Sequence, residues 1–239
     1  MDGFSYHNIF ETKGIEYIAI IMFLLLLIPF WIVLNRQVKV TKQMQKALGI
    51  LTAGILRIPQ GIFHSKNHTW THLERSGIAK VGLDDLILHL TGEVKFSFLR
   101  QKDELVNKGE LLAEIVHQDK VLRIYSPIAG QILETNALLN ESAEILNDDP
   151  FGKGWIYKMK PTNWIGDTSA YYLAEEATKW TTTELDRFKD FLAGSMKVHT
   201  TDSTQVVLQD GGELMDNTLA ELPVEVWQDF QKDFLNYKE

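Results

Sequence analysis

The sequence predicts a small, mainly β domain that lies between an N-terminal transmembrane helix and a C-terminal α-helical extension. Residues 17–34 carry no charge and are almost wholly apolar. Between residues 78 and 134, short runs of alternating apolar and polar residues are separated by turn residues, a pattern typical of β-strands. After Trp164 the apolar residues recur at three- and four-residue steps, which indicates helices.

The apolar run reads YIAIIMFLLLLIPFWIVL. At ~1.5 Å per residue, a helix of this length spans roughly 27 Å, close to the thickness of a bilayer's hydrocarbon core. A cleavable signal peptide would begin with basic residues and end in a small-residue cleavage site, but acidic residues precede this run, and bulky Trp31 and Leu34 end it. A buried core helix would keep a polar face. We therefore expect a retained transmembrane helix over residues 15–35.

Basic residues flank this helix unequally. Lys13 alone precedes it, whereas four follow it closely: Arg36, Lys39, Lys42 and Lys46. The positive-inside rule then predicts a single-pass protein of the inner (cytoplasmic) membrane, with a short extracytoplasmic tail over residues 1–14 and the main domain in the cytoplasm. Residues 36–60 are expected to form a juxtamembrane linker. Apolar residues are near helical spacing at residues 36–58, and Gly49, Gly54, Pro59 and Gly61 interrupt this pattern and mark the linker's end.

Composition excludes several classes of function. The net charge of −8 argues against nucleic acid as a partner. The absence of cysteine excludes disulfides, cysteine-ligated metal sites and thiol catalysis by this chain. Five histidines could suggest a metal site, but their spacing fits no zinc pattern: His64, His68, His72, His89 and His117.

Two further features are expected to be structural. His68, close to Trp70, is interpreted as a packing and hydrogen-bonding residue, and the pair Asp148-Asp149 before Pro150 as part of a turn. The sequence contains no nucleophile–base–acid set and no phosphate-binding glycine loop. We therefore predict that the chain is not an enzyme, and we identify no metal and no small-molecule substrate.

Six elements are expected within the β region. Residues 78–83, 94–98, 111–116, 121–125 and 131–134 are predicted as strands, and residues 84–90 as a short helix. In the C-terminal extension, residues 164–239, a helix is expected to begin at Asp167, Thr168 or Ser169. A short strand is expected at residues 206–208, and a last helix is expected from Pro223, burying an aromatic stripe that includes Trp227.

Short motifs occur in a characteristic order through residues 61–163. They are His68-Thr-Trp70, Val81-Gly-Leu-Asp84, Gly92-Glu-Val94, Val106-Asn-Lys-Gly-Glu110, Tyr125-Ser-Pro-Ile-Ala-Gly130, Leu146-Asn-Asp-Asp-Pro-Phe-Gly-Lys-Gly-Trp155 and Lys158-Met-Lys-Pro161. By these motifs the region resembles the H protein of the glycine cleavage system. The resemblance implies a barrel-sandwich hybrid, the fold of lipoyl and biotinyl domains. It also implies a lipoate on a lysine at the tip of a β-hairpin, which carries aminomethyl groups or electrons between partner proteins.

The sequence departs from the family at this tip. The family's Glu-Ser-Val-Lys-Ala lysine stands six residues before the tyrosine of Tyr-Ser-Pro, which corresponds to Asp119 here. Lys120 comes one residue later, although the pair Asp119-Lys120 is similar to the Asp-Lys pair of lipoyl domains in 2-oxoacid dehydrogenase acyltransferases. Because a one-residue slip in a hairpin moves a side chain to the opposite face, two interpretations stay open. Lys120 is either a lipoyl lysine or an unmodified, solvated lysine.

Three hypotheses for function follow. The chain is a membrane-anchored lipoyl carrier that uses Lys120, a carrier fold without cofactor that serves as a docking or structural subunit of a membrane redox complex, or an ordinary H protein that is tethered. The off-register lysine, the anchor and the extension together favour the second. Its partners would be the membrane and the protein subunits of that complex.

Overall fold

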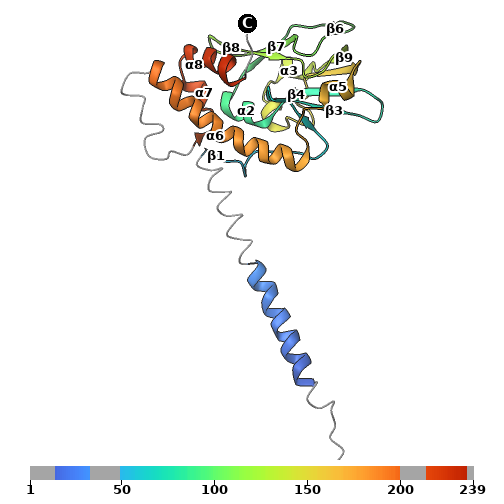
Figure 1. Cartoon of the computed structure of the whole chain (residues 1–239), viewed down its shortest axis with the longest axis vertical. Coiled ribbons are helices and arrows are strands. Elements are labelled where there is room, and N and C mark those ends of the chain that lie inside the picture. The colour runs from blue at the N-terminus through green and yellow to red at the C-terminus, as the bar shows by residue number, and fades with distance from the viewer. Residues whose placement is uncertain (1–13, 33–48, 200–213, 236–239) are drawn as a thin grey trace, which may run out of the picture. The chain divides into compact units, whose positions relative to one another are not determined.

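The computed structural model describes residues 14–32, 49–199 and 214–235 (Figure 1). The chain divides into two units, Met1–Leu48 and Gly49–Glu239, which are described separately. Several predictions fall outside the described residues: most of the N-terminal tail, the basic residues that follow the apolar run, and the strand at residues 206–208.

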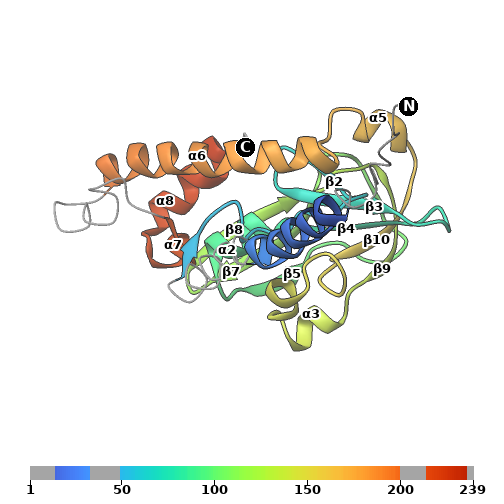
Figure 2. The same cartoon turned by 90° about the horizontal axis from the view of Figure 1, so that it is seen from below.

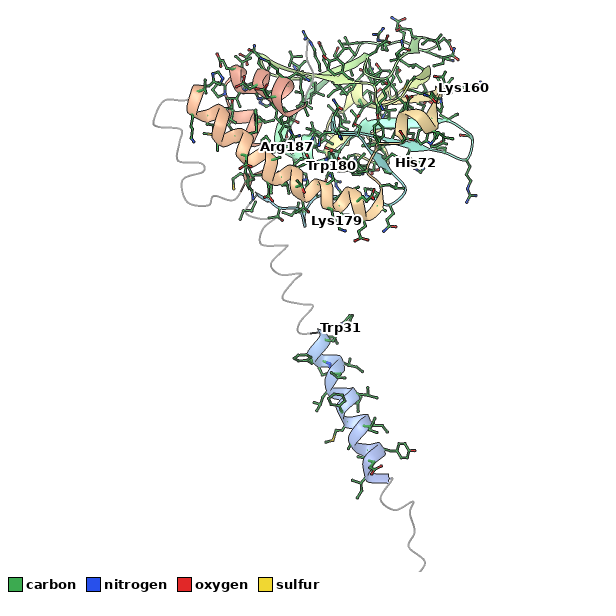
Figure 3. All side chains as sticks on the ribbon, in the orientation of Figure 1. Trp31, His72, Lys160, Lys179, Trp180 and Arg187 are labelled. Carbon is green, nitrogen blue, oxygen red and sulfur yellow. The ribbon has the colours of Figure 1, made fainter. Side chains whose placement is uncertain are left out.

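The first unit contains one described helix, Gly14–Ile32. Its mean hydropathy is 2.5, and its side chains are exposed, as Figure 3 shows for Trp31. This helix is long and apolar enough to cross a membrane.

The second unit is built on antiparallel β-sheets. A six-stranded sheet has the order β2 (Phe63–His64), β3 (Thr69–Leu73), β4 (Ala79–Leu83), β10 (Tyr157–Pro161), β9 (Gly130–Thr135) and β6 (Leu105–Val106). A three-stranded sheet has the order β5 (Lys95–Phe98), β7 (Leu111–His117) and β8 (Lys120–Tyr125). A third pairing joins β1 (Ile50–Leu51) to β11 (Leu214–Met215). The five strands predicted within the β region are present, whereas β1, β2, β3, β6, β10 and β11 were not predicted.

The core lies between the two larger sheets. Ile115 and Leu122 from the small sheet and Val81, Ile132 and Tyr157 from the large one are completely buried in one hydrophobic cluster. Full burial of such aliphatic side chains contributes about 1.5–3 kcal/mol each. The packing of the two sheets around this cluster is that of a barrel-sandwich hybrid.

Short helices close the ends of the sheets. α2 (Asp85–Thr91) occupies the predicted position, and the Asp84 carboxylate caps it by accepting a hydrogen bond from the Ile87 amide at 3.1 Å. α3 (Leu138–Glu141) and α4 (Ile145–Asp148) follow β9. Asp149 then accepts hydrogen bonds from the amides of Gly152 and Lys153 and begins the expected turn, whereas Asp148 is the last residue of α4.

The start of the long C-terminal helix was predicted wrongly. α5 (Trp164–Thr168) is a single short helix, and α6 (Ala174–His199) begins after it. The Asp167 carboxylate does not cap a helix, because it accepts a hydrogen bond from the Ala129 amide at 2.7 Å. Tyr172 then forms a β-bridge with His64, which keeps the chain extended before α6.

Three further elements complete the fold: α7 (Thr218–Glu221), α8 (Val224–Asp229) and the π-helical turn η2 (Phe230–Phe234). α8 begins directly after Pro223, as predicted, and Trp227 is buried within it. Figure 2 shows α6 running along one side of the strands, with α7 and α8 near its C-terminal half.

A buried charge network holds α6 to the β domain. The His68 imidazole lies between Asp84, 2.7 Å from Nδ1, and Glu184, 3.3 Å from Nε2. Arg187 donates to Glu184 at 2.8 Å and to the Phe234 carbonyl at 3.0 Å, so the network continues into η2. Figure 3 shows Arg187 and Trp180 on the side of α6 that faces the strands. His68 is therefore a packing and hydrogen-bonding residue, as the sequence suggested.

The network gives the fold a pH dependence. Burial lowers the pKa of His68, but the Asp84 and Glu184 carboxylates outweigh it and raise the pKa to about 9. Burial also lowers the pKa of His89, but the carboxylates of Asp216 and Asp85 outweigh this effect and raise the pKa to about 9. A histidine with a raised folded-state pKa stabilises the fold fully below its unfolded value of about 6.5 and loses that contribution as pH rises towards 9.

We predict that the free energy of unfolding of residues 49–239 falls by about 2 kcal/mol or more between pH 6.5 and pH 9. Urea denaturation at a series of pH values measures it. His68→Gln is expected to remove part of this slope, and His89→Gln another part. An unchanged slope in both variants would show that other groups cause the pH dependence.

Candidate functional site

The β7–β8 hairpin contains the residues that the sequence singled out. His117 pairs with Lys120, so Gln118 and Asp119 form the turn between the strands. Gln118 adopts a left-handed conformation with φ 56°, and both turn residues are exposed. The solvent-exposed tip of the hairpin thus presents an amide and a carboxylate.

Lys120 is the first residue of β8, and it is buried rather than solvated. Along β8 the buried residues are Lys120, Leu122 and Ile124, whereas Val121 and Arg123 are exposed. Lys120 therefore lies on the face of the strand that points into the domain. Its side chain is only 8% exposed, and Nζ donates a hydrogen bond of 2.6 Å to the Ala220 carbonyl.

Residues 214–235, here called the C-terminal cover, enclose this lysine. Trp227 lies 5.9 Å from Lys120 Nζ, measured to the ring centroid, and stacks on His117 at 6.2 Å. Its indole Nε1 donates to the Leu219 carbonyl at 2.6 Å, which orients the ring. The Gln231 side chain accepts a hydrogen bond from the Arg123 amide at 2.6 Å, so the cover also occupies the edge of β8 that faces away from β7.

A cleft of about 440 Å³ lies beside the turn. The described residues that line it include Gln118 but not Lys120, and its charged lining consists of Glu93, Lys95, Glu141 and Glu144. The His117 Nδ1 donates to the Glu93 carbonyl at 2.7 Å and so connects the hairpin to the wall of this cleft. Within residues 14–32, 49–199 and 214–235, no group of His, Asp and Glu is arranged to hold a metal ion.

The motifs that predicted the fold are structural. Trp70 faces Gly82 across β3 and β4, and a Cβ on that glycine would lie 2.5 Å from the indole ring. A Cβ at Gly130 would likewise lie 2.5 Å from the Lys160 carbonyl oxygen, so this position also requires glycine. Because these glycines make room for neighbouring groups of the sheet, they specify the scaffold and not a reactive site.

Comparison with known proteins identifies the scaffold. The sequence profile described as "Glycine cleavage H-protein" matches residues 62–184, just over half of the 239 residues. The chain belongs to the glycine cleavage H-protein family.

Its relatives include H proteins from archaea and bacteria. The probable glycine cleavage system H protein of Thermococcus kodakarensis is 32% identical over 114 residues, which cover 48% of this chain and 84% of that protein. The glycine cleavage system H protein of Thermus thermophilus is 35% identical over 118 residues, 49% of this chain and 91% of that protein. Among solved structures, the H protein of Mycobacterium marinum matches with 27% identity and a TM-score of 0.41, covering 44% of this chain and 87% of that one.

The family match ends at Glu184, so the C-terminal cover lies outside it. The domain is thus a lipoyl-carrier-type H-protein domain to which this chain adds a segment that packs on the carrier hairpin. The aromatic stripe around Trp227 is buried, as predicted. Its packing on Lys120 was not predicted, because the contact joins Ala220 and Lys120, which are 100 positions apart in the sequence.

Members of the family carry lipoate on a hairpin lysine, and the residues present here do not fit that group as folded. Asp119 lies in the exposed turn, but its carboxylate cannot form the amide that joins lipoate to a lysine. The amine of Lys120 is held by the Ala220 carbonyl beneath Trp227.

Trp227→Ala is expected to lower the free energy of unfolding of residues 49–239 by about 3–5 kcal/mol, because it removes a completely buried indole and its hydrogen bond. Urea denaturation measures it. Trp155→Ala is the matched control, since that indole is only half-buried and its ring centroid lies 4.5 Å from the Lys158 amine. A loss of less than about 1 kcal/mol at Trp227 would contradict the packing of the cover on the hairpin.

Proposed function

We propose that this chain is a membrane-anchored, H-protein-like docking subunit of a membrane redox complex, with its main domain in the cytoplasm and Lys120 unmodified. The observation that carries the proposal is the burial of Lys120 under the C-terminal cover, with its amine bonded to the Ala220 carbonyl. A carrier arm needs a solvated point of attachment that reaches several partner sites, and a buried amine does not provide one.

Two further features support a docking role. The helix Gly14–Ile32 is apolar enough to hold the protein at a membrane, where a freely diffusing carrier would gain nothing from an anchor. The exposed tip still presents Gln118 and Asp119 beside an open cleft, so the hairpin offers polar groups to a partner although its lysine is covered. A redox complex is proposed as the partner because the chemistry of this fold serves electron and one-carbon transfer.

A second candidate function is a lipoyl carrier with lipoate on Lys120. It is favoured by the position of Lys120 directly after the turn, only one residue from the family's site. This function requires the C-terminal cover to leave the hairpin, since the amine is enclosed in the present conformation.

Intact mass spectrometry of the protein purified from its native membrane in mild detergent distinguishes the two candidates. We expect the unmodified mass, together with stoichiometric copurification of other membrane subunits. A mass increased by one lipoyl group, mapped to the peptide that contains Lys120, would establish the carrier and exclude the docking proposal. The cells' other lipoyl proteins, fully modified, serve as the control.

A variant sharpens this test by restoring the family's position. Asp119→Lys combined with Lys120→Arg places an amine in the exposed turn and removes the buried one. With a lipoate–protein ligase, ATP and lipoate, we expect modification of this variant and none of the wild type or of Lys120→Arg alone. Modification of the wild type at Lys120 would support the carrier.

The anchor is tested by fractionation. We expect the full chain to stay in the membrane pellet after alkaline carbonate extraction and a chain without residues 1–35 to be released. Leu24→Arg with Leu26→Arg should also release it, because each arginine costs about 2.5–3.5 kcal/mol at the centre of a bilayer helix. The control is Leu24→Ile with Leu26→Ile. Retention of the double-arginine chain in the pellet would argue against a spanning helix.

A further inference from the structure

The strand that begins the second unit pairs directly with the C-terminal cover. In β1, Ile50 lies opposite Met215 and Leu51 opposite Leu214 of β11. The Asp216 amide donates to the Gly49 carbonyl at 2.7 Å, and Leu51 and Leu214 are 3% and 2% exposed. Residues 49–51, which the sequence predicted as part of the 36–60 linker, are therefore structural partners of the cover.

Polar contacts strengthen this connection. Arg57 forms an ion pair of 2.6 Å with Asp85 of α2. Asp85 lies 3.5 Å from the Nε2 of His89, whose Nδ1 is 2.8 Å from Asp216 of the cover. These four side chains join residues 49–57, the H-protein domain and the cover in one chain of charges, in which Asp85 is buried at 2% exposure.

The same part of the cover leads directly to Lys120. The Asn217 amide donates to the His89 carbonyl at 2.7 Å, and α7 starts at the next residue. Ala220 within α7 supplies the carbonyl that accepts the hydrogen bond of the lysine amine. Only four positions separate the residue bonded to Gly49 from the residue bonded to Lys120, so displacement of β11 moves the group that holds the lysine.

We propose that β1, β11 and α7 form a latch, in which pairing of β1 with β11 keeps Lys120 enclosed and opening of that pairing makes its amine reactive. The latch connects residues 49–51 to the hairpin of the H-protein domain. Its state decides whether the hairpin offers an unreactive buried lysine or an accessible primary amine. This inference concerns accessibility alone and does not depend on the proposed docking function.

A reversible crosslink tests the latch in the full chain. Since Gly49 and Asp216 form a hydrogen-bonded pair, Ile50 and Met215 form the adjacent non-hydrogen-bonded pair, where Cα atoms are closest and a disulfide fits. The chain has no cysteine, so Ile50→Cys with Met215→Cys creates the only thiols. In detergent micelles, the oxidised and reduced forms are treated with a water-soluble acetylating ester, and acetylation of each lysine is followed by peptide mass spectrometry.

We expect oxidation to slow acetylation of Lys120 about tenfold or more and reduction to restore it, because exposure of a buried group follows the free energy of local opening. Lys160, exposed in β10, is the internal control and should react equally in both forms. An unchanged rate at Lys120 on oxidation would overturn the latch, since the cover would then open independently of β1.

A variant that destabilises the latch is expected to have the opposite effect on Lys120 acetylation. Asp216→Ala removes the carboxylate that binds His89 and is expected to accelerate Lys120 acetylation about tenfold. Asp229→Ala is the matched control, because Asp229 also lies in the cover but binds Ser195 and His199 of α6. Equal acceleration in both variants would show general loosening of the cover and overturn the latch. A constant rate at Lys158, in the sheet, shows that the domain remains folded.

Discussion

The ionic contact of His68 with Asp84 and Glu184 determines where the C-terminal half of the protein lies. His68 is completely buried, and a buried imidazolium is tolerable only when carboxylates compensate its charge. Asp84 supplies one carboxylate from the β domain, and Glu184 supplies the other from α6. Arg187, one turn further along α6, neutralises Glu184 and binds the Phe234 carbonyl. The position of the C-terminal cover thus follows from a charge that the β domain could not bury alone.

The residues that define the family in this sequence maintain the scaffold. Gly82 accommodates Trp70, Gly130 accommodates the Lys160 carbonyl, and Asp84 both caps α2 and binds His68. All of these contacts lie away from the turn of the β7–β8 hairpin. The scaffold is therefore specified by residues other than Gln118 and Asp119, which form the turn.

Much of the β domain could be predicted because its information is local. Strand alternation in β5, β7 and β8, the Asp84 cap and the Pro223 helix start each depend on a few neighbouring residues. The features that the sequence did not disclose depend on distant partners. The sequence around Asp167 is typical of a helix cap, but its carboxylate accepts a hydrogen bond from the Ala129 amide. The environment of Lys120 depends on Ala220 and Trp227, which no local pattern relates to it.

The position of Lys120 at the start of β8 explains how the cover can enclose it. A lysine in the turn, at position 119, would extend into water, and enclosing it would require moving the cover beyond the tip. At position 120 the side chain takes the inward direction of Leu122 and Ile124, so its aliphatic part extends the core and its amine needs only one acceptor. Ala220 provides that acceptor from α7. Lys120 and the C-terminal cover are thus complementary parts of one arrangement, in which α7 and Trp227 extend the packing of the β domain over the start of β8.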